Sequence, residues 1–164
     1  MLVSFIEFYL EEALISIAVK NPLLVKDADI EKSRIFEVDS IEQLRSEMRL
    51  NWAHNALRPG GPETWRKKLR QLGAPGFDDN SLRKLQHLWD TRNLIVHSQC
   101  VASTAYVKKY PYMGVKVGEK VHVNLGIFKN WLSPTKAFIE WSDRFFLAYG
   151  SEPKKGTPGG ASTS

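Results

Sequence analysis

One stretch, from about residue 80 to residue 99, constrains the fold more than any other part of the chain. Its apolar residues recur with the 3.6-residue period of an α-helix, at Leu82, Leu85, Leu88, Trp89, Ile95 and Val96. This stripe predicts a long helix that packs against a core. Arg92 falls near the centre of the stripe, between Leu85 and Val96 in helical projection. Because burying an unpaired guanidinium is very costly, we expect something polar to meet this helix face.

The second half of the predicted helix carries a short polar pattern, Arg92 and Asn93 followed by His97. An arginine, a polar residue and then a histidine near the end of a helix resembles the RNase motif of the HEPN superfamily. In that family the histidine follows the arginine by four to six residues, commonly with Asn, His or Asp directly after the arginine. A long apolar first helix and a closing aromatic helix extend the resemblance over about residues 1–150. The resemblance implies a helical bundle that dimerises, with two motif helices around an RNA-cleaving cleft.

The rest of the chain predicts further helices. Residues 1–20 are apolar and end at Asn21-Pro22, and a capping box at 39–42 begins a helix to about Leu57. Pro62 begins a short helix that ends before Gly73. A last helix follows Ser133-Pro134 and ends at Gly150, with the proline either in its first turn or at a kink.

Between the motif helix and the last helix, the apolar period changes to two. Val115, Val117, Val121 and Val123 alternate with polar residues around Gly118-Glu119, which predicts a β-hairpin with a two-residue turn. The expected fold is therefore mostly α, a four- to five-helix HEPN-like bundle over residues 1–150 with a small β-hairpin before the last helix. Residues 151–164, rich in Gly, Pro, Ser and Thr, are expected to form a disordered tail.

Composition narrows the compartment and the partners. Twenty-three Lys+Arg against 18 Asp+Glu give a net charge of +5, which suits a polyanionic partner but is common among soluble proteins. Cys100 is the single cysteine, so no internal disulfide forms, and no apolar run reaches the ~18 residues of a membrane span. Without a basic leader at the N-terminus, we expect a cytoplasmic protein with no membrane association.

The motif residues suit the cleavage of RNA without a metal. His97 can take or give a proton near neutral pH, Arg92 can stabilise the charge on phosphate oxygens, and Asn93 can position the phosphate or the 2′-hydroxyl. Residues five apart lie about 140° apart around a helix, so one copy holds a single phosphate poorly. Two antiparallel copies related by a two-fold axis would face Arg92 and His97 of one toward those of the other. We expect no metal site and no cofactor, because the four histidines and Cys100 lack the spacing of zinc motifs. A Cys100–His97 nucleophilic pair is conceivable, although a small buried thiol is favoured.

Two basic clusters are weaker candidates for RNA binding. The helix after Pro62 carries one cluster, at Arg66, Lys67 and Arg70, and a solvated helix face explains it about as well. Lys108 and Lys109 form the other cluster beside two tyrosines, a mixture that suits single-stranded RNA. The alternative for this second cluster is an ordinary hairpin edge protected by lysines.

The sequence therefore predicts a homodimeric, metal-independent endoribonuclease, a toxin or antiviral effector restrained by a cognate antitoxin or a larger defence complex. One branch of the family carries a modified tyrosine two residues after the histidine. This chain has Gln99 there, so that form of control is in doubt. An alternative is a catalytically inert interaction or nucleotide-binding module. A purely structural alternative has His97 on the helix dipole and Arg92 paired with Asp90 or a glutamate of the first helix.

Overall fold

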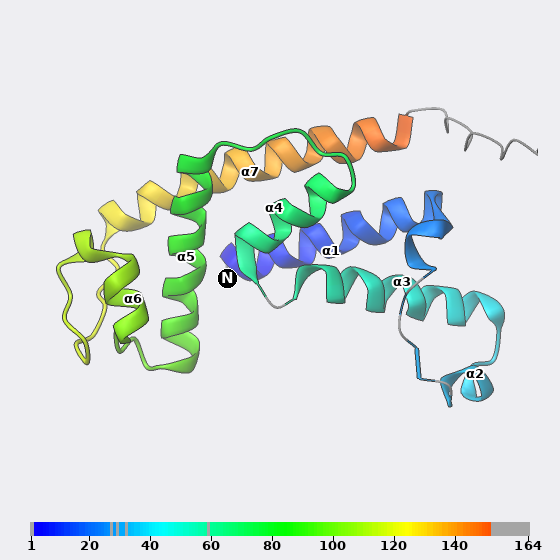
Figure 1. Ribbon diagram of the computed structural model, residues 1–164, viewed down its shortest axis with the longest axis horizontal. Coiled ribbons are helices and arrows are strands. Elements are labelled where there is room, and N and C mark those ends of the chain that lie inside the picture. The colour runs from blue at the N-terminus through cyan, green and yellow to red at the C-terminus, as the bar shows by residue number, and fades with distance from the viewer. Residues whose placement is uncertain (1, 27, 29, 32, 59, 152–164) are drawn as a thin grey trace, which may run out of the picture.

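The computed structural model describes residues 2–26, 28, 30–31, 33–58 and 60–151, which form a helical assembly without strands. Two 3-10 turns, η1 (Pro22–Val25) and η2 (Pro111–Met113), link some of its helices. The α-helices of this part are α1 (Leu2–Lys20), α2 (Arg34–Glu37), α3 (Ile41–Leu57), α4 (Gly61–Gln71), α5 (Asp79–His97), α6 (Thr104–Lys109) and α7 (Leu125–Ser151) (Figure 1). The predicted mostly α class is confirmed, with five helices of eleven residues or more. Apart from Ser151 in α7, the predicted tail lies outside the described residues.

Local capping signals account for the helix starts. The Ser40 hydroxyl accepts a hydrogen bond from the Gln43 backbone N–H at 3.1 Å, and the Gln43 side chain accepts one from the Asp39 N–H. This capping box lies one residue later than predicted. Asp78 caps α5 by accepting from the Ser81 N–H at 2.7 Å. Each cap satisfies N–H groups that a helix leaves unpaired in its first turn.

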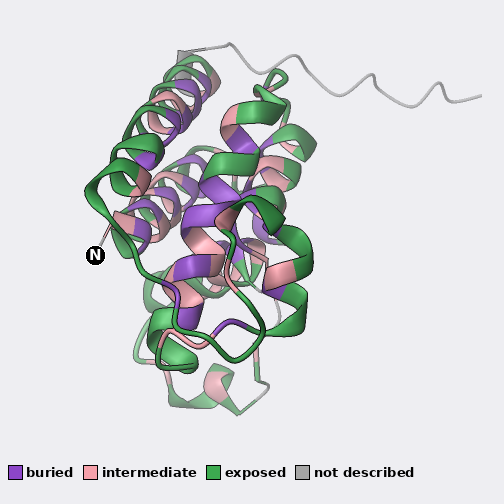
Figure 2. Ribbon diagram, turned by 90° about the vertical axis from the view of Figure 1, so that its left-hand side faces the viewer, coloured by how far each residue is buried: buried purple, intermediate pink, exposed green. Residues whose placement is uncertain are grey.

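The core lies where α1 meets α3 and α7, and α5 crosses one end of this layer against α7 and α4 (Figure 1). Ile6, Leu10 and Leu14 of α1 have no exposed surface, as expected for a central helix. In Figure 2 the buried residues gather along the helix faces that meet each other. No helix of the described part is long and apolar enough to cross a membrane.

The predicted β-hairpin is wrong. The valine-rich segment forms a loop that pairs with the residues after α5: Val121 N–H bonds to the Cys100 carbonyl, and Ala102 N–H to the Glu119 carbonyl, both at 2.8 Å. Gly118 has φ 86° at the third position of a turn closed by Glu119 N–H on Lys116 O, the place that a type II turn keeps for glycine. Turns of this type splay strands and do not pair them, so the alternation does not produce a hairpin.

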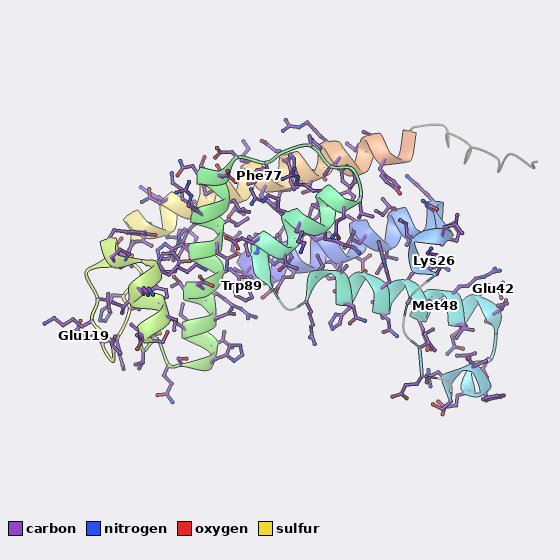
Figure 3. The ribbon with its side chains drawn as sticks, viewed as in Figure 1. Lys26, Glu42, Met48, Phe77, Trp89 and Glu119 are labelled. Atoms are coloured by element: carbon purple, nitrogen blue, oxygen red, sulfur yellow. The ribbon has the colours of Figure 1, made fainter. Side chains whose placement is uncertain are left out.

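The last helix is continuous through Pro134. It begins at Leu125 and includes Ser133, so the proline does not start a new helix. A proline inside a helix removes one hydrogen bond, and packing must offset that loss. Phe138 and Trp141 supply such packing. Both are buried, and their ring centroids lie 5.2 and 5.1 Å from that of Phe77, which is labelled in Figure 3.

Candidate active site on the exposed face of α5

The C-terminal half of α5 extends below α1 and α3 in Figure 1, with α6 beside it. Leu94 faces the small core formed with α6, while Ile95 is 50% exposed and Val96 is 56% exposed. The prediction that Ile95 and Val96 continue a buried stripe is therefore wrong. The stripe is covered only where α4, α7 and α1 reach it, along the first half of the helix. We call the uncovered surface the motif face; it consists of Arg92, Asn93, Ile95, Val96 and His97.

Arg92 is half-buried, and its guanidinium reaches its own neighbour. Nη1 of Arg92 donates to Oδ1 of Asn93 at 3.0 Å. The side chain also lines a hollow of about 510 Å³ beside Glu7, Phe8 and Glu11 of α1. No carboxylate of the described residues forms an ion pair with Arg92, so the pairing with Asp90 or with a glutamate of α1 is not observed. Among the described residues, the bond to Asn93 is the hydrogen bond that the guanidinium donates.

Trp89 holds the inner edge of this hollow. It is labelled in Figure 3, where it lies on α5 next to the start of α4. The two helices approach so closely that a Cβ added to Gly61 would come within 2.6 Å of the indole, and Gly61 has φ 63°. A side chain at Gly61 would therefore displace Trp89, one helical turn before Arg92. The glycine lets α4 position the wall of the hollow.

His97 is the last residue of α5 and is exposed. Within the part of the chain that the structure describes, its ring has no hydrogen-bond or ion-pair partner, and it is not joined to Arg92 or Asn93. The helix ends directly after it, because Gln99 and Cys100 take left-handed conformations with φ 50° and 68°. Cys100 N–H then bonds to the Leu94 carbonyl at 3.0 Å. One copy of the chain therefore presents the motif residues on one surface without assembling them into a site.

The basic clusters lie on α4 and α6 and are not part of the motif face. Arg66 forms an ion pair with Asp79 at the start of α5, about 27 Å along the helix from His97, and Lys67 and Arg70 are exposed on α4. Lys109 bonds to Asp90 at 2.7 Å, which neutralises its charge, and Lys108 is exposed on α6. Within the described part of the chain, none of these five residues forms a hydrogen bond or ion pair with His97.

The other side of α5 carries a buried polar network that the sequence analysis did not predict. Trp131 Nε1 donates to Nδ1 of His87 at 3.3 Å, Nε2 of His87 bonds to the Tyr106 hydroxyl at 3.0 Å, and that hydroxyl bonds to Thr91 at 3.0 Å. Because an indole N–H only donates, Nδ1 of His87 accepts and the proton sits on Nε2. Burial lowers the pKa of His87, so its ring is neutral.

Asp90 extends this network toward solvent. Its carboxylate accepts from Gln86 at 3.0 Å, from Lys109 and from the Tyr110 hydroxyl. Burial, followed by the bond to Asp90, raises the pKa of Tyr110, so this hydroxyl stays protonated. The i,i+4 spacing of Gln86 with Asp90 and of His87 with Thr91 is the signal in the sequence. This spacing predicts that the two residues of each pair lie on the same side of the helix, but it does not predict the aromatic residues that bury them.

Among the described residues, no three His, Cys, Asp or Glu side chains are placed to share a metal ion. No protein-family model, no curated protein and no solved structure matches this chain.

Proposed function

We propose that the chain is a metal-independent endoribonuclease that acts as a homodimer through the motif faces of two copies. One observation carries the proposal: Arg92, Asn93 and His97 lie on the part of α5 that extends past the core helices, where Arg92 and Asn93 are half-buried and His97 is exposed. Neither Arg92 nor His97 forms an ion pair with any residue that the structure describes. Buried or paired, these residues would serve the fold. Because the side chains of Arg92 and His97 have no ion-pair partner among the described residues, they can serve the ribonuclease chemistry that the resemblance to the HEPN superfamily implies.

The exposed apolar residues of the motif face support dimerisation. Ile95 and Val96 are each at least half exposed, and Phe8 of α1, 63% exposed, lines the same hollow as Arg92. Adjacent exposed hydrophobics on a soluble domain mark an interaction surface. A second copy is the occupant we propose, because it adds the catalytic groups that one copy cannot converge. Two-fold pairing of α5 with α5 presents Arg92 of one copy opposite His97 of the other.

The proposed reaction is a transesterification. One His97 removes the proton of the ribose 2′-hydroxyl, whose oxygen attacks the phosphorus atom. The P–O5′ bond breaks, and the His97 of the other copy gives a proton to the leaving 5′-oxygen. Arg92 stabilises the added negative charge of the phosphorane, and Asn93, whose Oδ1 already orients the Arg92 guanidinium, holds the phosphate. The products are a 2′,3′-cyclic phosphate and a 5′-hydroxyl.

The resemblance also supports a role as a toxin or antiviral effector, with a cognate antitoxin or a larger defence complex restraining the activity. In cells, overexpression of the wild type is expected to arrest growth. The His97→Ala variant is expected to leave growth unaffected, because it lacks the acid–base group.

An RNA-cleavage assay in EDTA tests the proposal. Wild-type protein is expected to cut single-stranded RNA, to spare DNA of the same sequence, and to leave 5′-hydroxyl ends that a polynucleotide kinase labels without prior dephosphorylation. His97→Ala is expected to lower the rate by about 10²–10⁴, the usual contribution of an acid–base group.

Ser98→Ala is the matched control, because Ser98 is also exposed, follows His97 directly, and has no proposed role. Its rate should equal that of wild type. Cleavage that stops in EDTA and returns with magnesium would show that the site is assigned wrongly. A folded wild type that cuts no RNA while Arg92→Ala and His97→Ala both lose a protein partner would favour the inert interaction module.

A further inference from the structure

A second site lies beside the N-terminal half of α5, apart from the motif face. It is a cleft of about 1130 Å³ between the first half of α5, the turn η2 with the loop after it, and the start of α7. Its α5 wall includes Arg83, Lys84 and His87, all in the first half of the helix, whereas the motif face belongs to its last two turns. His97 lies thirteen residues after Lys84, a rise of about 20 Å along the helix. The cleft and the motif face are therefore separate places.

Positive charge dominates this cleft. Arg83, Lys84, Lys109 and Lys120 line it, against the single carboxylate of Glu63. Lys109 is neutralised by Asp90, but Arg83 and Lys120 form no ion pair with any residue that the structure describes. Two unpaired cations from distant parts of the sequence, one on a helix and one on a loop, face the same space. This arrangement suits phosphate oxygens.

The cleft also presents an aromatic ring in a fixed place. Tyr112 of η2 is 70% exposed, yet its ring stands at 78° to Tyr110 and at 80° to His87, with ring centroids 6.0 and 5.6 Å away. The turn that carries it is closed by Gly114 N–H on the Pro111 carbonyl. The contacts with Tyr110 and His87 fix the position of the Tyr112 ring, and its exposed surface is one on which a nucleobase can stack.

Amide groups complete the lining. Asn80, Asn124 and Asn130 all face the cleft. Asn130 lies four residues before Pro134, and a proline has no N–H to bond to the carbonyl at that position. The backbone carbonyl of Asn130 therefore lacks its usual helical donor at the edge of the cleft. Carbonyl and side-chain amide groups can read the polar edge of a base.

We propose that this cleft binds a phosphorylated nucleoside, with the base stacked on Tyr112 and the phosphates held by Arg83 and Lys120. The ligand chemistry has two sources, a free nucleotide or one residue of a single-stranded RNA. The inference does not rest on the proposed function, because none of its residues belongs to the motif face. It holds whether or not the chain cleaves RNA.

Isothermal titration calorimetry with three probes tests this site. ATP carries both a base and phosphates, tripolyphosphate carries phosphates alone, and a 2′-O-methyl octanucleotide offers nucleotides in a strand that 2′-hydroxyl attack cannot cut. Binding of ATP identifies a free nucleotide as the source, and binding of the octanucleotide alone identifies a strand. Either result supports the proposal, and it is overturned if neither binds at millimolar concentration.

Variants locate the binding. Arg83 and Lys120 are both exposed, and the double variant Arg83→Ala with Lys120→Ala is expected to weaken binding tenfold or more. Each substitution removes a charged hydrogen bond to phosphate, which is worth about tenfold in affinity. Tyr112→Ala is expected to weaken it by about tenfold through lost stacking, with no effect on tripolyphosphate. Lys20→Ala with Arg144→Ala removes the same two charges from exposed sites outside the cleft, and should leave affinity unchanged.

Two results would overturn the proposal even if binding is seen. One is equal affinity for ATP and tripolyphosphate that Tyr112→Ala does not change, which would mean an anion site without base recognition. The other is binding that the Arg83 and Lys120 variants leave intact. His97→Ala, tested in parallel, should bind the same probe with wild-type affinity. A failure of the proposed ribonuclease function can therefore be distinguished from a failure of the nucleotide site.

Discussion

His87 and His97 lie ten residues apart on α5 and have opposite environments. The ring of His87 is buried between α5, α6 and α7, with both of its nitrogens hydrogen-bonded. The ring of His97 is exposed and has no such partner in the described part of the chain. The same contrast separates Asp90, which accepts hydrogen bonds from three side chains, from Arg92, which among the described residues donates to Asn93 alone.

The two sides of α5 therefore place their polar residues in different environments. On the buried side, His87, Asp90 and Thr91 all have hydrogen-bond partners, as expected because an unpaired buried polar group is costly. On the motif face, water still solvates the side chains, so the fold does not need them. We therefore expect changes on the buried side to affect stability and changes on the motif face to affect function.

After that of His97→Ala, the largest effect is expected at Arg92. Arg92→Ala should lower the RNA-cleavage rate by about 10²–10³, since it removes a donor to the charge of the transition state. Arg92→Lys should recover little, because a point charge does not replace the planar fork. Single-turnover kinetics measure the rate, and Arg144→Lys, an exposed arginine of α7, is the control. If Arg92→Ala unfolds the protein while the rate per folded molecule stays normal, Arg92 belongs to the fold.

The next effect concerns stability. His87→Ala leaves the Trp131 indole N–H without its acceptor and the Tyr106 hydroxyl without one of its partners, and it opens a cavity. We expect the free energy of unfolding to fall by about 2–4 kcal/mol. Urea denaturation followed by circular dichroism measures it. His122→Ala, an exposed histidine, should change stability by less than about 0.5 kcal/mol. Equal effects of the two substitutions would contradict the buried network.

A smaller effect is expected on assembly. Val96→Glu places a charge in the proposed dimer interface and should raise the dimer dissociation constant by at least about tenfold, because the carboxylate loses water when it is buried. Light scattering over a dilution series measures this constant. Val117→Glu is the matched control, because Val117 has the same 56% exposure but lies in the loop after η2. A wild type that is monomeric at micromolar concentration and still active would rule out the composite site.

The smallest effect is the pH dependence that His87 contributes. Burial lowers its pKa in the folded state from the ordinary value of 6.5, so in mild acid the unfolded chain binds the proton more readily. Stability from this group is complete above pH 6.5 and is lost as pH falls through the lowered pKa. Urea denaturation between pH 7.5 and 5.5 should show a shallower slope for His87→Gln than for wild type. His122→Gln should keep the wild-type slope, and identical slopes in all three would mean that His87 is not buried neutral.

Local patterns in the sequence determined much of the helical structure. The periods and caps of residues 1–20, 40–57 and 62–72 predicted α1, α3 and α4 to within a few residues, because propensity and capping act between neighbours. The motif residues were also readable, since they lie within a turn or two of one helix. The role of the motif, like the dimer, stays a prediction.

Only the tertiary structure decided which faces are covered. Ile95 and Val96 continue the apolar period but project past the elements that bury its first half, so no pattern within the helix distinguishes them from Leu85 and Leu88. The valine-rich loop alternates like a strand but bonds to residues 100–102, a pairing that depends on where α5 ends. His87 lies buried because Trp131 and Tyr106, from two other helices, complete its hydrogen bonds. Burial is a property of neighbours that are distant in the sequence, and a local pattern states only which residues share a side.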